Sequence, residues 1–262
     1  MRQFRLAVGT RCFAEPLLES IKTAAELNVK GVQFDLRYEL RASEITSTGR
    51  RDLLHQISEY GLIVSGAVFP LNYPLFEQDK LDVRIAAIRD AMKFAYSLNS
   101  TVLCLRVGRI PEEAESKDRQ LLVEVLSDLA RHSTHIGTTL AITPTNDSAE
   151  TLLKLVQEIK TGLIGIDFDP AHFAMTRRPV AESLRILHEH VVHVQLRDGD
   201  SGMRGGEERA VGRGNVDWIE VFALLSEMDY RGWLTAIRTE GDDRASDIRR
   251  GLGLIRQSLL GG

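Results

Sequence analysis

Two short apolar segments of this chain end in polar side chains that could do chemistry. The segments IGIDFDPAH and VVHVQLRDG supply carboxylate, imidazole, amide and guanidinium groups, from Asp169, His172, Gln195, Arg197 and Asp198. A carboxylate and an imidazole can move protons, whereas amide and guanidinium groups bind the oxygen atoms of a small ligand. The two segments therefore predict an active site in which Asp169 and His172 are the proton-transfer residues.

These polar clusters need elements that bring them together, and the chain alternates short apolar runs with long amphipathic ones. Eight runs are typical of parallel strands buried on both faces, and they begin at Phe4, Gly31, Leu62, Thr101, Thr138, Leu163, Val191 and Gly232. The segments between them repeat apolar residues at the spacing of helices that cover a sheet. Eight alternations predict an α/β fold, a single (β/α)8 TIM barrel over residues 1–262.

An open, doubly wound sheet is the competing fold. It would need a glycine-rich phosphate turn after an early strand, and the segment GTRCFAEP after the first strand is no such turn. Two connections, residues 38–49 and 199–215, are long. In a barrel, active sites lie at the carboxyl ends of the strands, so we expect these long loops to border the binding site.

Composition excludes several classes of function. Hydrophobic residues make up 43% and charged residues 27% of the chain, and the net charge is −4, which is unlike a nucleic-acid binder. Cys12 and Cys104 are too few for a zinc knuckle or a disulfide framework, so we expect reduced thiols. The chain starts without a signal-peptide pattern and has no apolar run near the roughly 20 residues that cross a bilayer. We expect a cytoplasmic protein with neither nucleic acid nor membrane as partner, and a homo-oligomer stays open.

The order of the motifs resembles the xylose isomerase-like superfamily of TIM barrels. This group includes sugar isomerases and epimerases, inosose dehydratases and class-two apurinic endonucleases. The resemblance rests on KGVQFDLR, LAITP, IDFDPAH, HVQLRDG and GRGNVDWIEVFALLSEMDYRGWL, which are spread along most of the chain. It implies one divalent metal at the barrel mouth, on a Glu, an Asp, a His and a second Glu. Such an ion polarises a carbonyl and stabilises an enediolate while a proton moves between carbons.

Carried over to this sequence, the four metal-ligand positions fall on Thr143, Asp169, Gln195 and Ile237. Asp169 alone is a strong ligand, since isoleucine offers no donor atom and the other two offer neutral oxygens. The charge of the ligand set falls from about −3 to −1, which removes most of the attraction for a divalent ion. We therefore expect a degenerate metal site and no cofactor, with a divalent metal held through Asp169 and neutral donors as the alternative.

The residues left at the mouth suit a hydroxylated or anionic small ligand. Strand alternation places His193 in a packed lower layer and turns Arg238 away from the lumen. His172 keeps the spacing at which the family's histidine lines the pocket. The arginines could instead be solvated charges or ion-pair partners. The predicted substrate-binding residues are Gln33, Arg106, Thr143, Gln195, Arg197 and Arg213.

The resemblance favours a sugar isomerase/epimerase-like protein, or a lyase, of carbohydrate metabolism. It would bind a small polyol, keto-sugar or related acid, and Arg106 and Arg197 would hold the oxyanion that a metal otherwise stabilises. The alternative is a catalytically inactive barrel that acts as a ligand sensor or partner-binding subunit, which Ile237 favours. A DNA-repair function is not expected, because the chain has only seven histidines for the several further ligands of that branch.

Overall fold

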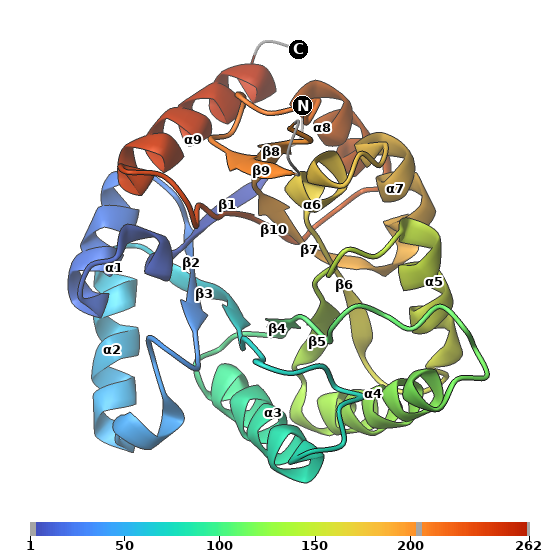
Figure 1. The fold of residues 1–262 in the computed structure, drawn as a ribbon. Helices are drawn as coiled ribbons and strands as arrows, with labels where there is room; N and C mark the ends of the chain where they lie inside the picture. Colours follow the sequence, from blue (N-terminus) through green and yellow to red (C-terminus); the bar gives the residue numbers. More distant parts are fainter. Residues whose placement is uncertain (1–3, 203–205, 261–262) are drawn as a thin grey trace.

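The computed structural model describes residues 4–202 and 206–260, and the parallel strands in this part close into a (β/α)8 barrel, as predicted (Figure 1). The barrel closes because β1 pairs with both its sequence neighbour β2 and the last strand, β10. The eight barrel strands are β1 (Arg5–Gly9), β2 (Gly31–Asp35), β3 (Ile63–Val68), β4 (Val102–Leu105), β5 (Thr139–Ile142), β6 (Ile164–Phe168), β7 (Val191–Leu196) and β10 (Trp233–Ala236).

A ring of helices surrounds the barrel and lies where the amphipathic segments predict it (Figure 1). Several helices begin at a side chain that accepts a hydrogen bond from the backbone N–H three residues later, as Ser116, Ser148 and Asp217 do. The ring comprises α1 (Leu17–Glu26), α2 (Ser47–Glu59), α3 (Leu81–Ser97), α4 (Lys117–Ile136), α5 (Ala149–Glu158), α7 (Val180–Leu187), α8 (Trp218–Glu227) and α9 (Arg244–Leu260).

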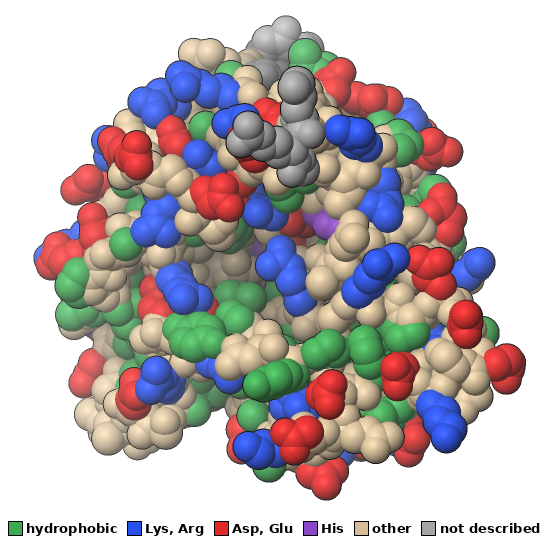
Figure 2. Space-filling model, in the orientation of Figure 1, with side chains coloured by type: hydrophobic (Ala, Val, Ile, Leu, Met, Phe, Trp, Pro, Cys, Tyr) green, Lys and Arg blue, Asp and Glu red, His purple; other side chains and the backbone are tan. Residues whose placement is uncertain are grey.

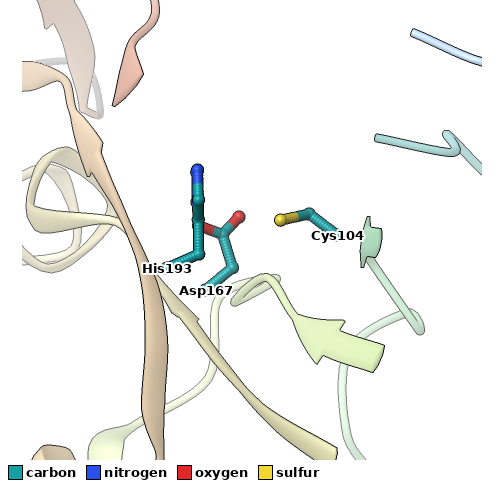
Figure 3. Close-up of side chains that lie close together, drawn as sticks. All are labelled: Cys104, Asp167 and His193. Atoms are coloured by element: carbon teal, nitrogen blue, oxygen red, sulfur yellow. The ribbon is translucent and has the colours of Figure 1, made fainter. Parts of the chain in front are cut away.

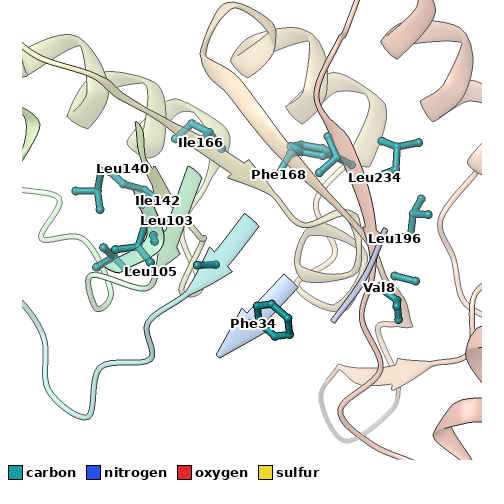
Figure 4. Close-up of a cluster of buried hydrophobic side chains, with 14 of the residues drawn as sticks. Val8, Phe34, Leu103, Leu105, Leu140, Ile142, Ile166, Phe168, Leu196 and Leu234 are labelled. Carbon is teal, nitrogen blue, oxygen red and sulfur yellow. The ribbon is translucent and has the colours of Figure 1, made fainter. Parts of the chain in front are cut away.

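The apolar core lies between the strands and this ring of helices. Side chains on the outer face of the strands, among them Phe34, Leu103, Phe168 and Leu234, are fully buried there (Figure 4). Both cysteines are also buried and free. Within the described residues, no helix is long and apolar enough to cross a membrane.

The polar segment after β7 has more structure than its sequence predicts. The sequence predicts a loop over residues 199–215, but β8 (Asp198–Asp200) pairs with β9 (Glu207–Arg209) in an antiparallel hairpin; residues 203–205 of this segment lie outside the described residues. The hairpin packs on a short helix, α6 (Pro170–Met175), so closely that a Cβ at Gly206 would lie 2.3 Å from the Cβ of Met175. The hairpin is thereby fixed beside the end of β6.

Two irregularities in the strand register adjust the barrel interior. One residue, Val192, has no partner on β6, because Ile166 aligns with Val191 and Asp167 aligns with His193. This shift places the carboxylate of Asp167 beside the imidazole of His193 inside the barrel. The second shift lies between Val32 and Gln33 on β2.

Candidate functional site

A cavity of about 520 Å³ opens at the carboxyl ends of the strands. This is the size of many small-molecule sites. Figure 2 shows Lys and Arg side chains around the hollow of this face. The predicted residues that line the cavity are Gln33, Arg106, Thr143, Gln195 and Arg197, and Ile237 lines it as well.

The floor of the cavity is a polar layer built around Asp167. Its Oδ2 accepts hydrogen bonds from Thr143 Oγ1 and Gln195 Nε2, each at 2.6 Å, and its Oδ1 lies 2.7 Å from His193 Nδ1. The other ring nitrogen of His193 lies 2.8 Å from Thr235 Oγ1. Burial alone would raise the pKa of Asp167, but His193 and the hydrogen bonds hold it below its ordinary value. Asp167 is therefore an ionised carboxylate, and His193 is packed in the lower layer as predicted.

This layer also contains a group of potential metal ligands, Cys104, Asp167 and His193 (Figure 3). One ligand atom of each lies within 4.8 Å of the others. Both oxygens of Asp167 and both ring nitrogens of His193 already have hydrogen-bonding partners. Burial and the neighbouring Asp167 raise the pKa of the Cys104 thiol well above its ordinary value, whereas a metal needs the thiolate. The group is a satisfied hydrogen-bonded layer and fits a metal poorly.

Asp169 is fully buried and faces guanidinium groups. Its Oδ2 accepts a hydrogen bond of 2.8 Å from Arg197 Nη1, and Arg106 Nη2 lies 3.8 Å from the same oxygen. Its Oδ1 accepts the backbone N–H of His172, because Asp169 caps α6. Two guanidinium groups therefore lie beside the carboxylate that the sequence predicts as the strong ligand of a metal site.

A second buried carboxylate, Glu208 of β9, extends this charged cluster. It pairs with Arg197 Nε at 2.7 Å and with Arg238 Nη1 at 2.9 Å, and it accepts the backbone N–H of Thr239. Burial disfavours the charge on Arg197, but Asp169 and Glu208 raise its pKa above the ordinary value. The cluster thus ties the β8–β9 hairpin to the ends of β6, β7 and β10.

The predicted orientation of Arg238 is wrong. Strand alternation predicts that its side chain points away from the lumen, yet it lines the cavity and pairs with Glu208. The reason is that β10 ends at Ala236, so strand alternation no longer governs the residues beyond it. Arg11, Arg244 and Glu208 also belong to the mouth or its support, and the sequence does not predict them because nothing in their local sequence marks them.

Three other predicted residues lie away from the cavity lining within the described structure. Arg213 is exposed in the turn after β9. His172 is buried, and its Nε2 lies 3.1 Å from the carbonyl oxygen of Asp147. Burial lowers the pKa of His172 below its ordinary value. Asp198 accepts hydrogen bonds from the backbone of Gly212 and from Trp218 Nε1, so it holds the turn that leads to α8.

The fold and the position of the cavity define a (β/α)8 barrel with a candidate ligand site at the carboxyl ends of its strands. The sequence profile of the xylose isomerase-like TIM barrel family matches residues 21–258, so the chain belongs to that family.

Individual relatives are distant. An uncharacterized protein of Methanocaldococcus jannaschii is 27% identical over 191 residues, which are 66% of this chain and 63% of that protein. An L-ribulose 3-epimerase of a Methylomonas species is 24% identical over 165 residues, 56% of this chain and 53% of that protein. The chain thus spans less than two thirds of these curated relatives. The crystal structure of a xylose isomerase domain protein from Planctomyces limnophilus matches with a TM-score of 0.86, at 22% identity and with 100% of both chains covered.

Proposed function

We propose that this protein is a sugar isomerase/epimerase-like barrel that binds a small polyol, keto-sugar or related acid at its mouth without the family's divalent metal. One observation carries the proposal: the guanidinium of Arg197 pairs with Asp169, the one strong ligand retained at the metal positions. The guanidinium of Arg197 then supplies, as part of the chain, the positive charge that a bound metal ion would supply in the family. The L-ribulose 3-epimerase among the relatives supports the sugar-like ligand class.

The donor set argues against the metal. A divalent ion at this place would have to compete with Arg197 and Arg106 for Asp169. Thr143 and Gln195 donate their hydrogen bonds to Asp167, and Ile237 has no donor atom. Hard cations bind carboxylate and carbonyl oxygens, and three of the four positions do not present a charged one.

In an active enzyme, Arg106 and Arg197 would bind the carbonyl oxygen of the ligand and stabilise the oxyanion that forms when a proton leaves the neighbouring carbon. Asp169 and His172 are the proton-transfer candidates. Both would have to gain access to the cavity when the ligand binds, because Asp169 is fully buried beside Arg197 and His172 bonds to the Asp147 carbonyl.

The same geometry favours a second candidate function, a catalytically inactive barrel that acts as a ligand sensor. Among the described residues that line the cavity, the one carboxylate is Asp35, and Arg11 forms an ion pair with it. A base held in this way is poorly suited to take a proton from carbon. Such a barrel would bind its ligand and use the occupied state as the signal.

One experiment tests the metal-free enzyme against its alternatives. The protein would be purified without chelator, its Mn, Co and Zn content measured, and its turnover followed on ketoses, inososes and sugar acids. The proposal expects substoichiometric metal together with measurable turnover. Stoichiometric metal required for turnover would overturn the metal-free site. Zero turnover with a ligand-dependent rise in melting temperature would favour the sensor.

The proposal also covers the cellular compartment of the protein and its oligomeric state. Two buried, free cysteines suit a reducing compartment, and we place the protein in the cytoplasm as a carbohydrate-metabolism protein with no nucleic-acid or membrane partner. A homo-oligomer remains part of this proposal, and size-exclusion chromatography with light scattering tests it.

A further inference from the structure

We propose that the ligand of the mouth cavity is anionic, with a carboxylate or phosphate group bound by arginines of the lining, Arg244 foremost. This inference rests on the proposed function, because it names the ligand class of the same cavity. Its basis is the excess of arginine over carboxylate in the lining, together with one arginine that has no partner in the described structure.

The charge of the cavity lining is strongly one-sided. Within the described residues it contains one carboxylate, Asp35, and five arginines, which are Arg11, Arg106, Arg197, Arg238 and Arg244. Arg11 pairs with Asp35 and stacks on the ring of Tyr38, 4.7 Å from its centroid. The charge of Asp35 is therefore already matched, and four arginines remain to be considered.

Three carboxylates behind the lining pair with three of these four arginines. Arg197 pairs with Asp169 and Glu208. Arg238 pairs with Glu208 and with Asp247, at 2.9 and 3.0 Å. These two arginines are about 12% and 11% exposed, so they serve mainly to neutralise the carboxylates beneath the surface.

Arg106 is paired more loosely than Arg197 and Arg238, and Arg244 is left without a partner in the described structure. The side chain of Arg106 is 53% exposed, its Nη2 lies 3.8 Å from Asp169 Oδ2, and its Nε donates a hydrogen bond to the carbonyl oxygen of Pro144. The guanidinium of Arg244, at the start of α9, has neither an ion pair nor a hydrogen bond to any residue that the structure describes. Its neighbour in the lining, Cys12, offers no negative charge, because burial raises the pKa of that thiol to about 11.

A half-buried cation without a partner weakens the folded state unless a ligand or solvent ions compensate it. Neutral sugars offer hydroxyl groups but no charge. A carboxylate or phosphate offers both the charge and the two or three acceptor oxygens that guanidinium groups bind best. An acidic sugar derivative therefore fits this lining better than the neutral sugar of the same shape.

The experiment compares three ligands of one shape by calorimetry: a neutral hexose, its sugar acid and its sugar phosphate. Inorganic phosphate is run alone to detect binding that needs no sugar. We expect at least one charged ligand to bind about tenfold or more tightly than the neutral hexose, and this preference to shrink as salt rises from 50 to 500 mM, roughly as screening requires. The carboxylate and phosphate arms identify which acid the site takes.

Charge-removing variants locate the interaction. R244Q should weaken binding of the preferred acid by about 10- to 100-fold while neutral-hexose binding stays unchanged. R106Q should weaken binding of the acid and of the neutral hexose, because the proposed function also gives Arg106 the carbonyl oxygen of the ligand. R131Q is the matched control, since Arg131 is an exposed arginine of α4 that does not line the cavity. A melting temperature near that of the unaltered protein confirms that each variant is folded.

The outcomes separate this inference from the proposed function. Equal binding of acid and neutral sugar, with no effect of R244Q on either, would overturn the anionic ligand without contradicting the proposed sugar site. Binding of inorganic phosphate as tight as that of the sugar phosphate would also overturn it, because the sugar would then contribute nothing. Failure of every sugar, neutral or acidic, would count against the proposed function itself.

Discussion

Asp167 and Asp169 lie two residues apart at the end of β6, yet their surroundings differ. Asp167 accepts hydrogen bonds from Thr143, Gln195 and His193, which all come from barrel strands or from the residue that follows one. Asp169 faces Arg197 and Arg106, and Arg197 in turn depends on Glu208 of the hairpin. The strands thus determine the contacts of the lower layer, whereas long side chains and loops determine those of the mouth.

The floor and the mouth of the cavity contribute to different properties, the floor to stability and the mouth to ligand binding. Strand backbones fix the donors around Asp167, so that layer acts as a rigid floor. The guanidinium groups above it are carried on flexible side chains, and Arg106 is half exposed. A ligand can displace water from such groups without disturbing the barrel. We therefore expect changes in the floor to act on folding and changes in the mouth to act on binding.

The largest expected effect comes from the floor. Asp167→Asn removes the charge that three donors converge on and leaves one of them without an acceptor. We expect a loss of about 3–5 kcal/mol in the free energy of unfolding, measured by urea denaturation, as for other broken buried networks. Asp90→Asn, at an exposed position in α3, is the control and should change little. An equally mild effect of both substitutions would show that Asp167 is not an ionised centre.

The sequence predicts the floor and the fold better than it predicts the mouth. Inward-facing positions of a strand alternate, so the sequence alone places His193, Gln195 and Arg197 on one face of their strand. Apolar periodicity similarly locates every barrel strand in the described part. These inferences work because the backbone geometry of a strand is repeated along its length.

The sequence does not predict the arginine cluster, because its contacts come from loops that have no repeated backbone geometry. Glu208 contacts Arg197 and Arg238, which are 11 and 30 residues away along the chain, and it does so from a hairpin inside an expected loop. Arg238 lies beyond the end of β10, where alternation no longer applies. Partner choice among loop side chains depends on tertiary packing, which no local pattern encodes.

A smaller effect is expected from the link between the mouth and the hairpin. Glu208→Gln keeps the shape of the side chain but leaves Arg197 and Arg238 with one carboxylate each, Asp169 and Asp247. We expect a loss of about 2–3 kcal/mol in stability and faster hydrogen exchange confined to β8 and β9.

Glu207→Gln is the matched control on the same hairpin. Glu207 is exposed and pairs only with Arg209 in the described structure, so its loss should leave exchange of the hairpin unchanged. Equal protection of the hairpin in both variants would mean that packing on α6, not Glu208, holds the hairpin in place.

The smallest effect concerns His172, which lies beside the mouth but does not line it. Burial lowers the pKa of its imidazole below the ordinary value, so the unfolded chain takes up a proton at a higher pH than the folded protein does. Stability from this residue is therefore present above about pH 6.5, the pKa of an unfolded-chain histidine, and is lost as the pH falls below it. His172→Gln can keep a hydrogen bond to the Asp147 carbonyl but cannot titrate, and it should reduce the drop in unfolding free energy between pH 7.5 and pH 5.5.

His55→Gln, at an exposed position on α2, is the control and should leave that drop unchanged. A pH dependence that is identical in both variants would show that His172 is accessible to protons in the folded state, as a proton-transfer residue open to the cavity would be.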